Sequence, residues 1–285
     1  MRKPKRVVDS HVHFWDPAVL HYPWIEAVPA LRRAFVPGDL ESTDADSIDA
    51  FIFVEANCLG TESLAEVEFV EGLAGAESRI LGMVAHVDML DEDGRTHALD
   101  ALSRHGSVAG VRHNIQGHEQ GYCLEPAFVR GVKEAGLRGF TFDLCITAEQ
   151  LPDATQLALL CPEVQFILDH CGKPAIRDDS LEAWALGLFQ LAQCPNVVCK
   201  VSGLLTEARA DQQSLEALRP YLEEAHISFG VERLLFGSDW PVVTLAGSMD
   251  SWRGVVDAFT ESWSGEDRDA FYAGNAIRTY GLGGR

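Results

Sequence analysis

Eight short apolar runs recur along the whole chain, and each of them ends in polar or ionisable side chains. The runs cover residues 7–13, 50–55, 80–86, 108–113, 139–143, 164–170, 196–202 and 233–239. Each has four to eight residues, which is the length of a strand buried in a parallel sheet. Because parallel strands must be joined by long crossovers, the pattern predicts an α/β fold.

Segments with helical periodicity lie between the runs. In residues 64–73, 181–193 and 215–225, apolar side chains recur at intervals of three and four residues. Eight strand–helix units in 285 residues indicate a single (β/α)8 barrel of the TIM type, a fold that needs about 250 residues. We therefore expect one domain over residues 1–285. The alternative is an open doubly wound sheet, but the sequence lacks the Gly-x-Gly-x-x-Gly loop of its dinucleotide-binding members.

A long aromatic segment, residues 14–37, follows the first predicted strand and shows no clear periodicity. It holds four prolines and the rings of Trp15, Tyr22, Trp24 and Phe35. A loop after a barrel strand lies over the C-terminal mouth, where active sites of this fold are built. We therefore expect Trp15 and Trp24 to contact a substrate. The alternative is a surface loop that is packed by its own aromatic rings.

The charge and the cysteine content limit the partners and the compartment. A formal net charge of −20 argues against nucleic acid and against an anionic membrane surface, because both bind clustered Lys and Arg. No apolar stretch reaches the roughly 18 residues of a membrane span. Seven cysteines without a Cys-x-x-Cys pair are typical of reduced thiols in the cytoplasm. We expect a cytoplasmic protein, monomeric or homo-oligomeric, that acts on a small molecule.

Several strand ends offer groups that ligate metals. His11 and His13 are two residues apart, so both imidazoles point to the same face of a strand. Neutral imidazole suits Zn²⁺ and related divalent ions. His170 and Asp239 end two later runs, and all strands of a barrel end on one face, so these groups can meet. Glu55 ends the second run and could ligate the same ion or pair with a cation. The structural alternatives are a helix-capping Asp239 and a hydrogen-bonded core histidine at position 170.

Other strand ends carry groups that suit substrate binding. They are His86, Arg112, His113 and Lys200. Burying such groups without partners is costly, so their gathering at one face favours a polar pocket. We expect these side chains to orient a substrate. An internal ion pair is the alternative for Arg112, His113 and Lys200.

Five motifs, in this order, resemble the amidohydrolase superfamily. They are Val-Asp-Ser-His-Val-His-Phe-Trp-Asp at residues 8–16, Leu-Asp-His-Cys-Gly-Lys-Pro at 168–174, Lys-Val-Ser-Gly-Leu at 200–204, Phe-Gly-Ser-Asp-Trp-Pro at 236–241 and Tyr-Ala-Gly-Asn-Ala-Ile-Arg-Thr-Tyr-Gly-Leu at 272–282. The first motif, with the Tyr-Pro-Trp stretch at 22–24, is similar to the sugar-lactonase branch of that superfamily. This branch includes L-fucono- and L-rhamnono-lactonases, with dicarboxylate lactonases as relatives.

The resemblance implies hydrolysis of a cyclic ester and assigns a metal site. It carries His11 and His13 over as ligands from the first strand, and His170 and Asp239 as the histidine of the sixth strand and the acid of the eighth. No residue matches the lysine or glutamate that often bridges a second metal, so the resemblance implies a mononuclear site with zinc as the favoured ion. Some lactonases of this branch work without a metal, so the cofactor is either one divalent ion or none.

The expected reaction is attack of water on the ring ester of a sugar lactone, such as an L-fuconolactone, to give the sugar acid. Asp239 would take a proton from the water and return it to the leaving oxygen. His170 and Arg112 would stabilise the developing oxyanion. The sugar itself would be held by His86, His113, Lys200, Trp15 and Trp24.

Three alternatives remain open at this stage. One is a metal-independent dicarboxylate lactonase, and another is a decarboxylase of the same superfamily. The decarboxylase would favour two or more arginines in its pocket, because anionic substrates need bidentate partners, and only Arg112 ends a predicted strand. The third is a barrel that binds a metal or a sugar without turning it over.

Overall fold

The computed structural model describes residues 3–42 and 48–283 of the chain. Eight parallel strands follow one another around a sheet in the order of the sequence. They are β1 (Val8–Val12), β2 (Ala50–Val54), β3 (Ile80–His86), β4 (Val108–Arg112), β5 (Thr141–Leu144), β6 (Phe166–Leu168), β7 (Val197–Val201) and β8 (Leu234–Phe236). Each lies within one of the eight apolar runs or overlaps it, so the predicted (β/α)8 barrel is confirmed.

The last strand closes onto the first through the segment that follows β8. Val12 and Trp240 form a parallel bridge between the two segments. The N–H of His13 donates to the carbonyl of Trp240 over 2.8 Å, and the N–H of Asp239 donates to the carbonyl of His11 over 2.9 Å. The closure of the barrel therefore fixes the backbone of residues 11, 13 and 239 relative to one another.

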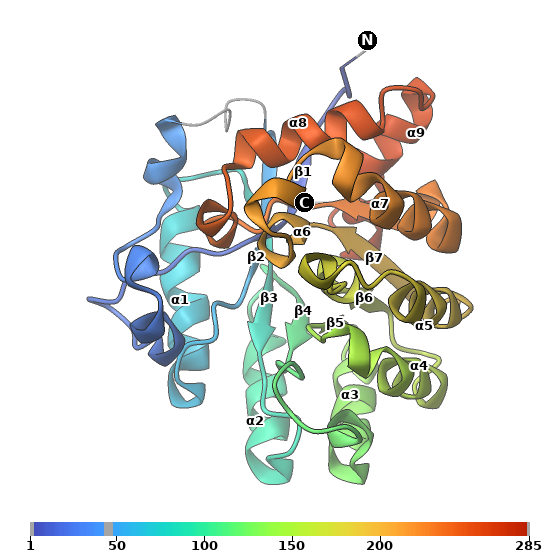
Figure 1. Cartoon of the computed structure of the whole chain (residues 1–285). Helices are drawn as coiled ribbons and strands as arrows, with labels where there is room; N and C mark the ends of the chain where they lie inside the picture. Colours follow the sequence, from blue (N-terminus) through green and yellow to red (C-terminus); the bar gives the residue numbers. More distant parts are fainter. Residues whose placement is uncertain (1–2, 43–47, 284–285) are drawn as a thin grey trace.

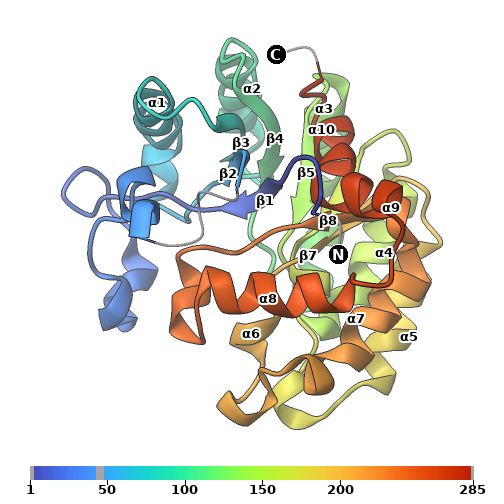
Figure 2. The same cartoon turned by 90° about the horizontal axis from the view of Figure 1, so that it is seen from above.

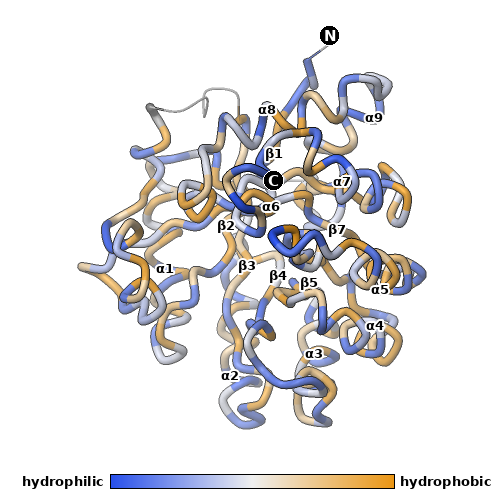
Figure 3. The backbone as a smooth tube through the Cα atoms, viewed as in Figure 1, coloured by the Kyte–Doolittle hydropathy of each residue, from blue (hydrophilic) through white to orange (hydrophobic). Residues whose placement is uncertain are grey.

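The main helices form the outer layer of the barrel, with the strands at the centre (Figures 1 and 2). They are α1 (Ser63–Ala74), α2 (Glu92–Leu102), α3 (Pro126–Leu137), α4 (Leu151–Leu160), α5 (Glu182–Ala192), α7 (Leu215–Phe229) and α8 (Met249–Phe259). Shorter helices are α6 (Leu204–Glu207), α9 (Gly265–Asp269) and α10 (Asn275–Thr279). Helices α1, α5 and α7 match the three segments in which the sequence shows helical periodicity. Along these helices hydrophobic residues alternate with hydrophilic ones, as expected for helices packed on one face (Figure 3).

The core has two parts, one on each side of the sheet. The larger cluster lies between the strands and the helices. The smaller one fills the barrel with strand residues such as Ile52, Val84 and Ile167, and it also includes Tyr280 and Leu282 of the C-terminal segment. A Cβ placed on Gly82 would lie 3.0 Å from the Leu282 side chain, so this segment packs directly against β3. None of the helices within residues 3–42 and 48–283 is both long and apolar enough to cross a membrane.

The aromatic segment after β1 folds into short 3₁₀ helices rather than an open loop. These are η1 (Pro23–Ala27), η2 (Pro29–Leu31) and η3 (Pro37–Ser42). Trp15 and Phe35 form an antiparallel bridge, and the fully buried Trp15 ring donates its indole N–H to the carbonyl of Arg33 over 2.9 Å. Trp24 is only partly buried and donates its indole N–H to the carbonyl of Ala56 over 2.7 Å. The segment is thus tied to its own core and to the end of β2.

Candidate active site

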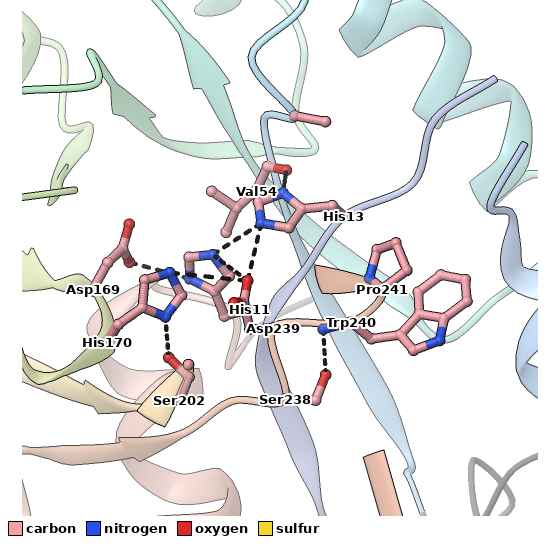
Figure 4. A network of polar contacts seen from close by, with 12 residues as sticks. His11, His13, Val54, Asp169, His170, Ser202, Ser238, Asp239, Trp240 and Pro241 are labelled. Carbon is pink, nitrogen blue, oxygen red and sulfur yellow. Dashed lines mark hydrogen bonds and ion pairs between the residues drawn. The ribbon is translucent and has the colours of Figure 1, made fainter. Parts of the chain in front are cut away.

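Three imidazoles and one carboxylate meet where β1, β6 and β8 end (Figure 4). The Nε2 atoms of His11 and His13 lie 3.1 Å apart. Asp239 Oδ1 lies 3.4 Å from Nε2 of His13, 3.7 Å from that of His11 and 3.9 Å from that of His170. All four side chains are buried. The structure therefore brings together the four residues on which the sequence-based prediction rests.

The backbone around Asp239 is built for close approach to β1. Asp239 has a positive φ of 62°, a conformation in which few residues other than glycine are found. A Cβ on Gly237 would lie 2.9 Å from Cβ of His11, so glycine is needed where the chain passes β1. The Asp9 carboxylate accepts from the N–H of Ser238 over 2.8 Å and bridges the two segments. These contacts hold the Asp239 carboxylate against the histidines.

His170 is held by the neighbouring strand β7. Its Nδ1 lies 2.8 Å from the hydroxyl oxygen of Ser202 (Figure 4). A Cβ on Gly203 would lie only 2.6 Å from the same nitrogen, so any larger residue there would displace the ring. The sequence Ser202-Gly203 after β7 therefore both orients His170 and leaves room for it.

Each of the three rings has its Nδ1 engaged, which leaves Nε2 facing Asp239. His13 Nδ1 lies 2.8 Å from the carbonyl oxygen of Val54, which can only accept, so Nδ1 carries the proton and Nε2 the lone pair. His11 Nδ1 lies 3.1 Å from Oδ1 of Asp169 and 3.2 Å from Nζ of Lys200, so these two groups hold its ring in place. Metal-binding histidines typically have this kind of partner on the other ring nitrogen.

The spacing of His11, His170 and Asp239 fits one divalent ion. Two ligands that lie 2.0–2.1 Å from a tetrahedral zinc ion are about 3.4 Å apart. Asp239 lies 3.4–3.9 Å from the three imidazoles, and His11 and His13 lie 3.1 Å apart, so these distances scatter around that value. One ligand atom each of His11, His170 and Asp239 lies within 4.8 Å of the other two. The donor set of imidazole nitrogens and one carboxylate oxygen is one that zinc prefers.

The electrostatics keep His11 and His170 neutral and Asp239 ionised. Burial lowers the pKa of His11, and it lowers the pKa of His170 to about 4. Burial acts to raise the pKa of Asp239, but the neighbouring His170, His13 and His11 outweigh it and hold that pKa well below its usual range. At neutral pH the site therefore offers lone pairs and one negative charge, which a cation or a proton would complement.

Glu55 lies away from this group, contrary to the ligand role predicted for it. Its carboxylate accepts from Nε of Arg112 over 2.6 Å and from the N–H of Asn57 over 2.6 Å. Arg112 also donates to Oδ2 of Asp169 over 3.1 Å. Glu55 therefore lies in an internal ion pair with Arg112, which is the alternative to a metal ligand that the sequence left open. This position does not support a role for Glu55 as a metal ligand.

Lys200 is also placed differently from the prediction that it binds substrate. Its side chain is fully buried, and Nζ lies 2.5 Å from Oδ2 of Asp143 and 3.0 Å from Oδ1 of Asp169. Tyr280 donates its hydroxyl to the same Asp143 carboxylate over 3.0 Å. Lys200 therefore lies inside the barrel, where it neutralises the buried Asp143 and Asp169 carboxylates and lies 3.2 Å from Nδ1 of His11.

Trp15, His86 and His113 lie outside the pocket at the site. Trp15 is fully buried in the aromatic segment, so a substrate cannot reach its ring. His113 accepts from the N–H of Met89 over 2.9 Å and packs against Tyr122, and His86 lines a neighbouring cavity beside β3. None of the three side chains is part of the wall of the pocket at Asp239.

A small cavity of about 250 Å³ opens above the site. Its wall contains the predicted residues His13, Trp24, Arg112, His170 and Asp239. It also contains residues that the sequence-based reasoning missed: Asn57, Asn114, Gln116, Cys145 and Lys173. Lys173 was within reach of that reasoning, because it lies three residues after His170 in the same motif. Asn114 and Gln116 follow the fourth predicted strand, in a segment without any regular pattern.

Comparisons with known proteins agree with this geometry. A profile of the amidohydrolase family matches residues 8–282. The L-fucono-1,5-lactonase of Burkholderia multivorans is 35% identical, and the match covers 96% of both chains. An L-rhamnono-gamma-lactonase of Scheffersomyces stipitis is 22% identical over 97% of this chain and 99% of the relative. A crystal structure of an amidohydrolase from Burkholderia multivorans with bound zinc superposes with a TM-score of 0.86 at 33% identity, over 97% of this chain and 99% of the other.

Proposed function

The chain belongs to the amidohydrolase family, and on this basis we propose that it hydrolyses the cyclic ester of a sugar lactone of the L-fuconolactone class. The observation that carries the proposal is the ionised Asp239 carboxylate, held among three imidazoles at the bottom of a pocket. The 35% identity to an L-fucono-1,5-lactonase over almost the whole chain supports the substrate class.

The pocket suits one small, uncharged ring. Its volume of about 250 Å³ is below the range of about 300–1,000 Å³ that is common for drug-sized ligands. The amides of Asn114 and Gln116 offer donors and acceptors for hydroxyl groups, and Trp24 offers part of its ring for packing. A monosaccharide lactone matches this combination of small size and neutral polar groups.

In the proposed reaction, water attacks the lactone carbonyl and the bond from that carbon to the ring oxygen breaks. Asp239 accepts a proton from the water as it attacks, and later gives this proton to the ring oxygen as it leaves. The product is the open sugar acid, so one water molecule is consumed and no other reactant is needed. One carboxylate can serve both steps because they follow one another.

The three histidines hold the reacting carboxylate in place and keep it ionised. Because the pKa of Asp239 is low, this carboxylate alone is a weak base, and the water must be made more acidic by another group. A divalent ion held by His11, His13, His170 and Asp239 would lower the pKa of a bound water to near 7 and polarise the carbonyl. Asp169 and Ser202 keep two of these rings in the orientation that such an ion requires.

An anionic substrate fits the pocket less well than a neutral one. A dicarboxylate lactone or an aromatic acid would call for several cationic partners. Arg112 and Lys173 line the pocket, but the Arg112 guanidinium already donates to Glu55 and to Asp169, which leaves the Lys173 ammonium as a single cation for an anionic group. We therefore place the dicarboxylate lactonase and decarboxylase activities second to the sugar lactonase.

A panel of lactones tests the proposal. The purified protein is incubated at pH 7 to 8 with L-fucono-, L-rhamnono- and other aldono-lactones, with a pyrone dicarboxylate and with dihydroxybenzoates, and acid or CO₂ release is followed. We expect acid release from the L-fucono-lactone at rates well above spontaneous hydrolysis. Turnover of the dicarboxylate or the aromatic acid alone would reject the sugar substrate, and no turnover of any lactone would reject the activity.

A further inference from the structure

The chain makes an unusual left-handed turn after β6. Four successive residues have positive φ: His170 at 52°, Cys171 at 51°, Gly172 at 69° and Lys173 at 48°. For residues with a side chain this conformation costs roughly 1–2 kcal/mol each. Such strain persists only where the surroundings impose it, and it gathers at functional sites.

Contacts on both sides of the turn impose this conformation. The Trp184 indole N–H donates to the carbonyl of Cys171 over 2.8 Å, and the Cys171 thiol donates to the carbonyl of Lys200 over 3.4 Å. The N–H of Lys173 donates to the carbonyl of His170 over 2.9 Å, which closes the turn. The turn is therefore a fixed part of the barrel and not a surface loop.

The turn places Lys173 beside His170. In a turn of the 3₁₀ type, side chains three residues apart lie one above the other. His170 and Lys173 have this spacing, and both side chains line the cavity above Asp239. In an extended connection, side chains three residues apart would point to opposite faces. The turn therefore brings a second functional group over the site, which an extended backbone would not do.

Lys173 differs from the other cations at the mouth of the barrel. Arg112 and Lys200 are both paired with buried carboxylates. The Nζ of Lys173 donates to Oε1 of Gln116, and within residues 3–42 and 48–283 no carboxylate forms an ion pair with it. An ammonium group has three N–H bonds, so it has donors left for a ligand in the cavity.

We propose that Lys173 is a catalytic residue that stabilises the negative charge on the lactone carbonyl oxygen as water attacks. Gln116 is the positioning residue that holds the ammonium group over the site. The proposal rests on the proposed lactonase function and deepens it, because it names the group that faces the oxyanion. It also replaces Arg112 in that role, since three of the five N–H donors of Arg112 already bind Glu55 and Asp169, whereas Lys173 has no carboxylate partner among the described residues.

The test is steady-state kinetics of Lys173→Met on the lactone that the wild type turns over best. Loss of one oxyanion donor typically lowers kcat about 100-fold or more, and we expect that loss with KM within about threefold of wild type. Lys133→Met, an exposed lysine on α3, is the matched control and should keep wild-type kinetics. Gln116→Ala should lower kcat by a smaller factor, of about 3–10, because the ammonium group remains but is no longer held.

Chemical rescue separates charge from structure. Lys173→Cys is treated with 2-bromoethylamine, which restores an ammonium group at nearly the same distance, and the wild type is treated in parallel as a control for alkylation of its own seven cysteines, of which Cys145 lines the cavity. We expect rescue to recover at least a tenth of wild-type kcat. A raised KM with normal kcat in Lys173→Met would overturn the oxyanion role, and so would unchanged kinetics. Failure of the wild type on every lactone would instead reject the proposed function.

Discussion

Replacing Lys200 with methionine tests whether this lysine serves the interior of the barrel or the substrate. Methionine keeps the length and the apolar stem of the side chain but removes its charge. The substitution takes away a group that lies 2.5 Å from Asp143 and 3.0 Å from Asp169, with all three side chains fully buried. Breaking a buried ion pair by removing one partner typically costs about 3–5 kcal/mol of unfolding free energy.

That cost falls within reach of a simple assay. Folded proteins of ordinary stability have an unfolding free energy of about 5–15 kcal/mol, so Lys200→Met should still fold at 25 °C. With an m-value of about 3 kcal/mol per molar urea, the midpoint of unfolding should fall by about 1–2 M. Tryptophan fluorescence reports the transition, since the chain has six tryptophans.

A double variant identifies the cause of the loss. Asp143→Asn removes one of the carboxylates that lose their cation in Lys200→Met, and the Tyr280 hydroxyl can still donate to the asparagine oxygen. Lys200→Met with Asp143→Asn should therefore be more stable than Lys200→Met alone. A midpoint shift below about 0.3 M in the single variant, or no recovery in the double variant, would refute the reasoning. A large rise in KM with unchanged stability would show instead that Lys200 binds substrate.

Three further predictions use other parts of the molecule. Trp24→Ala should raise KM for the lactone with little effect on stability, because Trp24 lines the pocket. Trp15→Ala should instead cost about 3–5 kcal/mol of unfolding free energy, because that ring is fully buried. The reverse pattern would contradict the assigned positions. Burial and the nearby Glu55 raise the pKa of Glu66 to about 8 from an ordinary 4.5, so its contribution to stability is complete at acid pH and is lost as the pH rises through 8. The melting temperature of Glu66→Gln, measured from pH 5 to 9, should therefore fall less with pH than that of the wild type. An equal fall in both proteins would count against a raised pKa. Zinc added to chelator-treated protein should raise the melting temperature, and less so in His11→Ala, while equal shifts in both proteins would place the ion elsewhere.

The architecture could be predicted from the sequence because it depends on local patterns. Apolar runs of strand length and helical periodicity between them define the (β/α) repeat, and closure into a barrel then brings the strand ends to one face. His11, His13, His170 and Asp239 were found by that reasoning alone. Their convergence follows from topology and does not require any knowledge of individual contacts.

The partners of the other strand-end residues could not be predicted in the same way. A polar residue at a strand end indicates a position at the mouth but does not say which neighbour it pairs with. Glu55 and Arg112 come from β2 and β4, and their pairing depends on side-chain length and direction in three dimensions. His113 could have been excluded, because it follows Arg112 directly and successive side chains in a strand point to opposite faces.

The left-handed turn after β6 explains why the sequence did not predict Lys173 as part of the site. Asp169 and His170 are neighbours, yet one reaches His11 inside the barrel and the other faces Asp239 from the pocket. This arrangement, and the position of Lys173 above it, depend on positive φ values that the residue types do not announce. Sequence patterns assume ordinary backbone conformations, so they fail where the site uses a strained one.

The most direct test of the account is the turnover of Asp239→Asn on the lactone that the wild type hydrolyses best. The amide has nearly the same shape as the carboxylate but cannot take a proton from water. We predict a loss of kcat of at least about 100-fold, with a cooperative unfolding transition retained, while Asp211→Asn, at an exposed carboxylate in an η helix, keeps normal kinetics. Near-normal turnover in Asp239→Asn would contradict the central claim that this carboxylate activates the water.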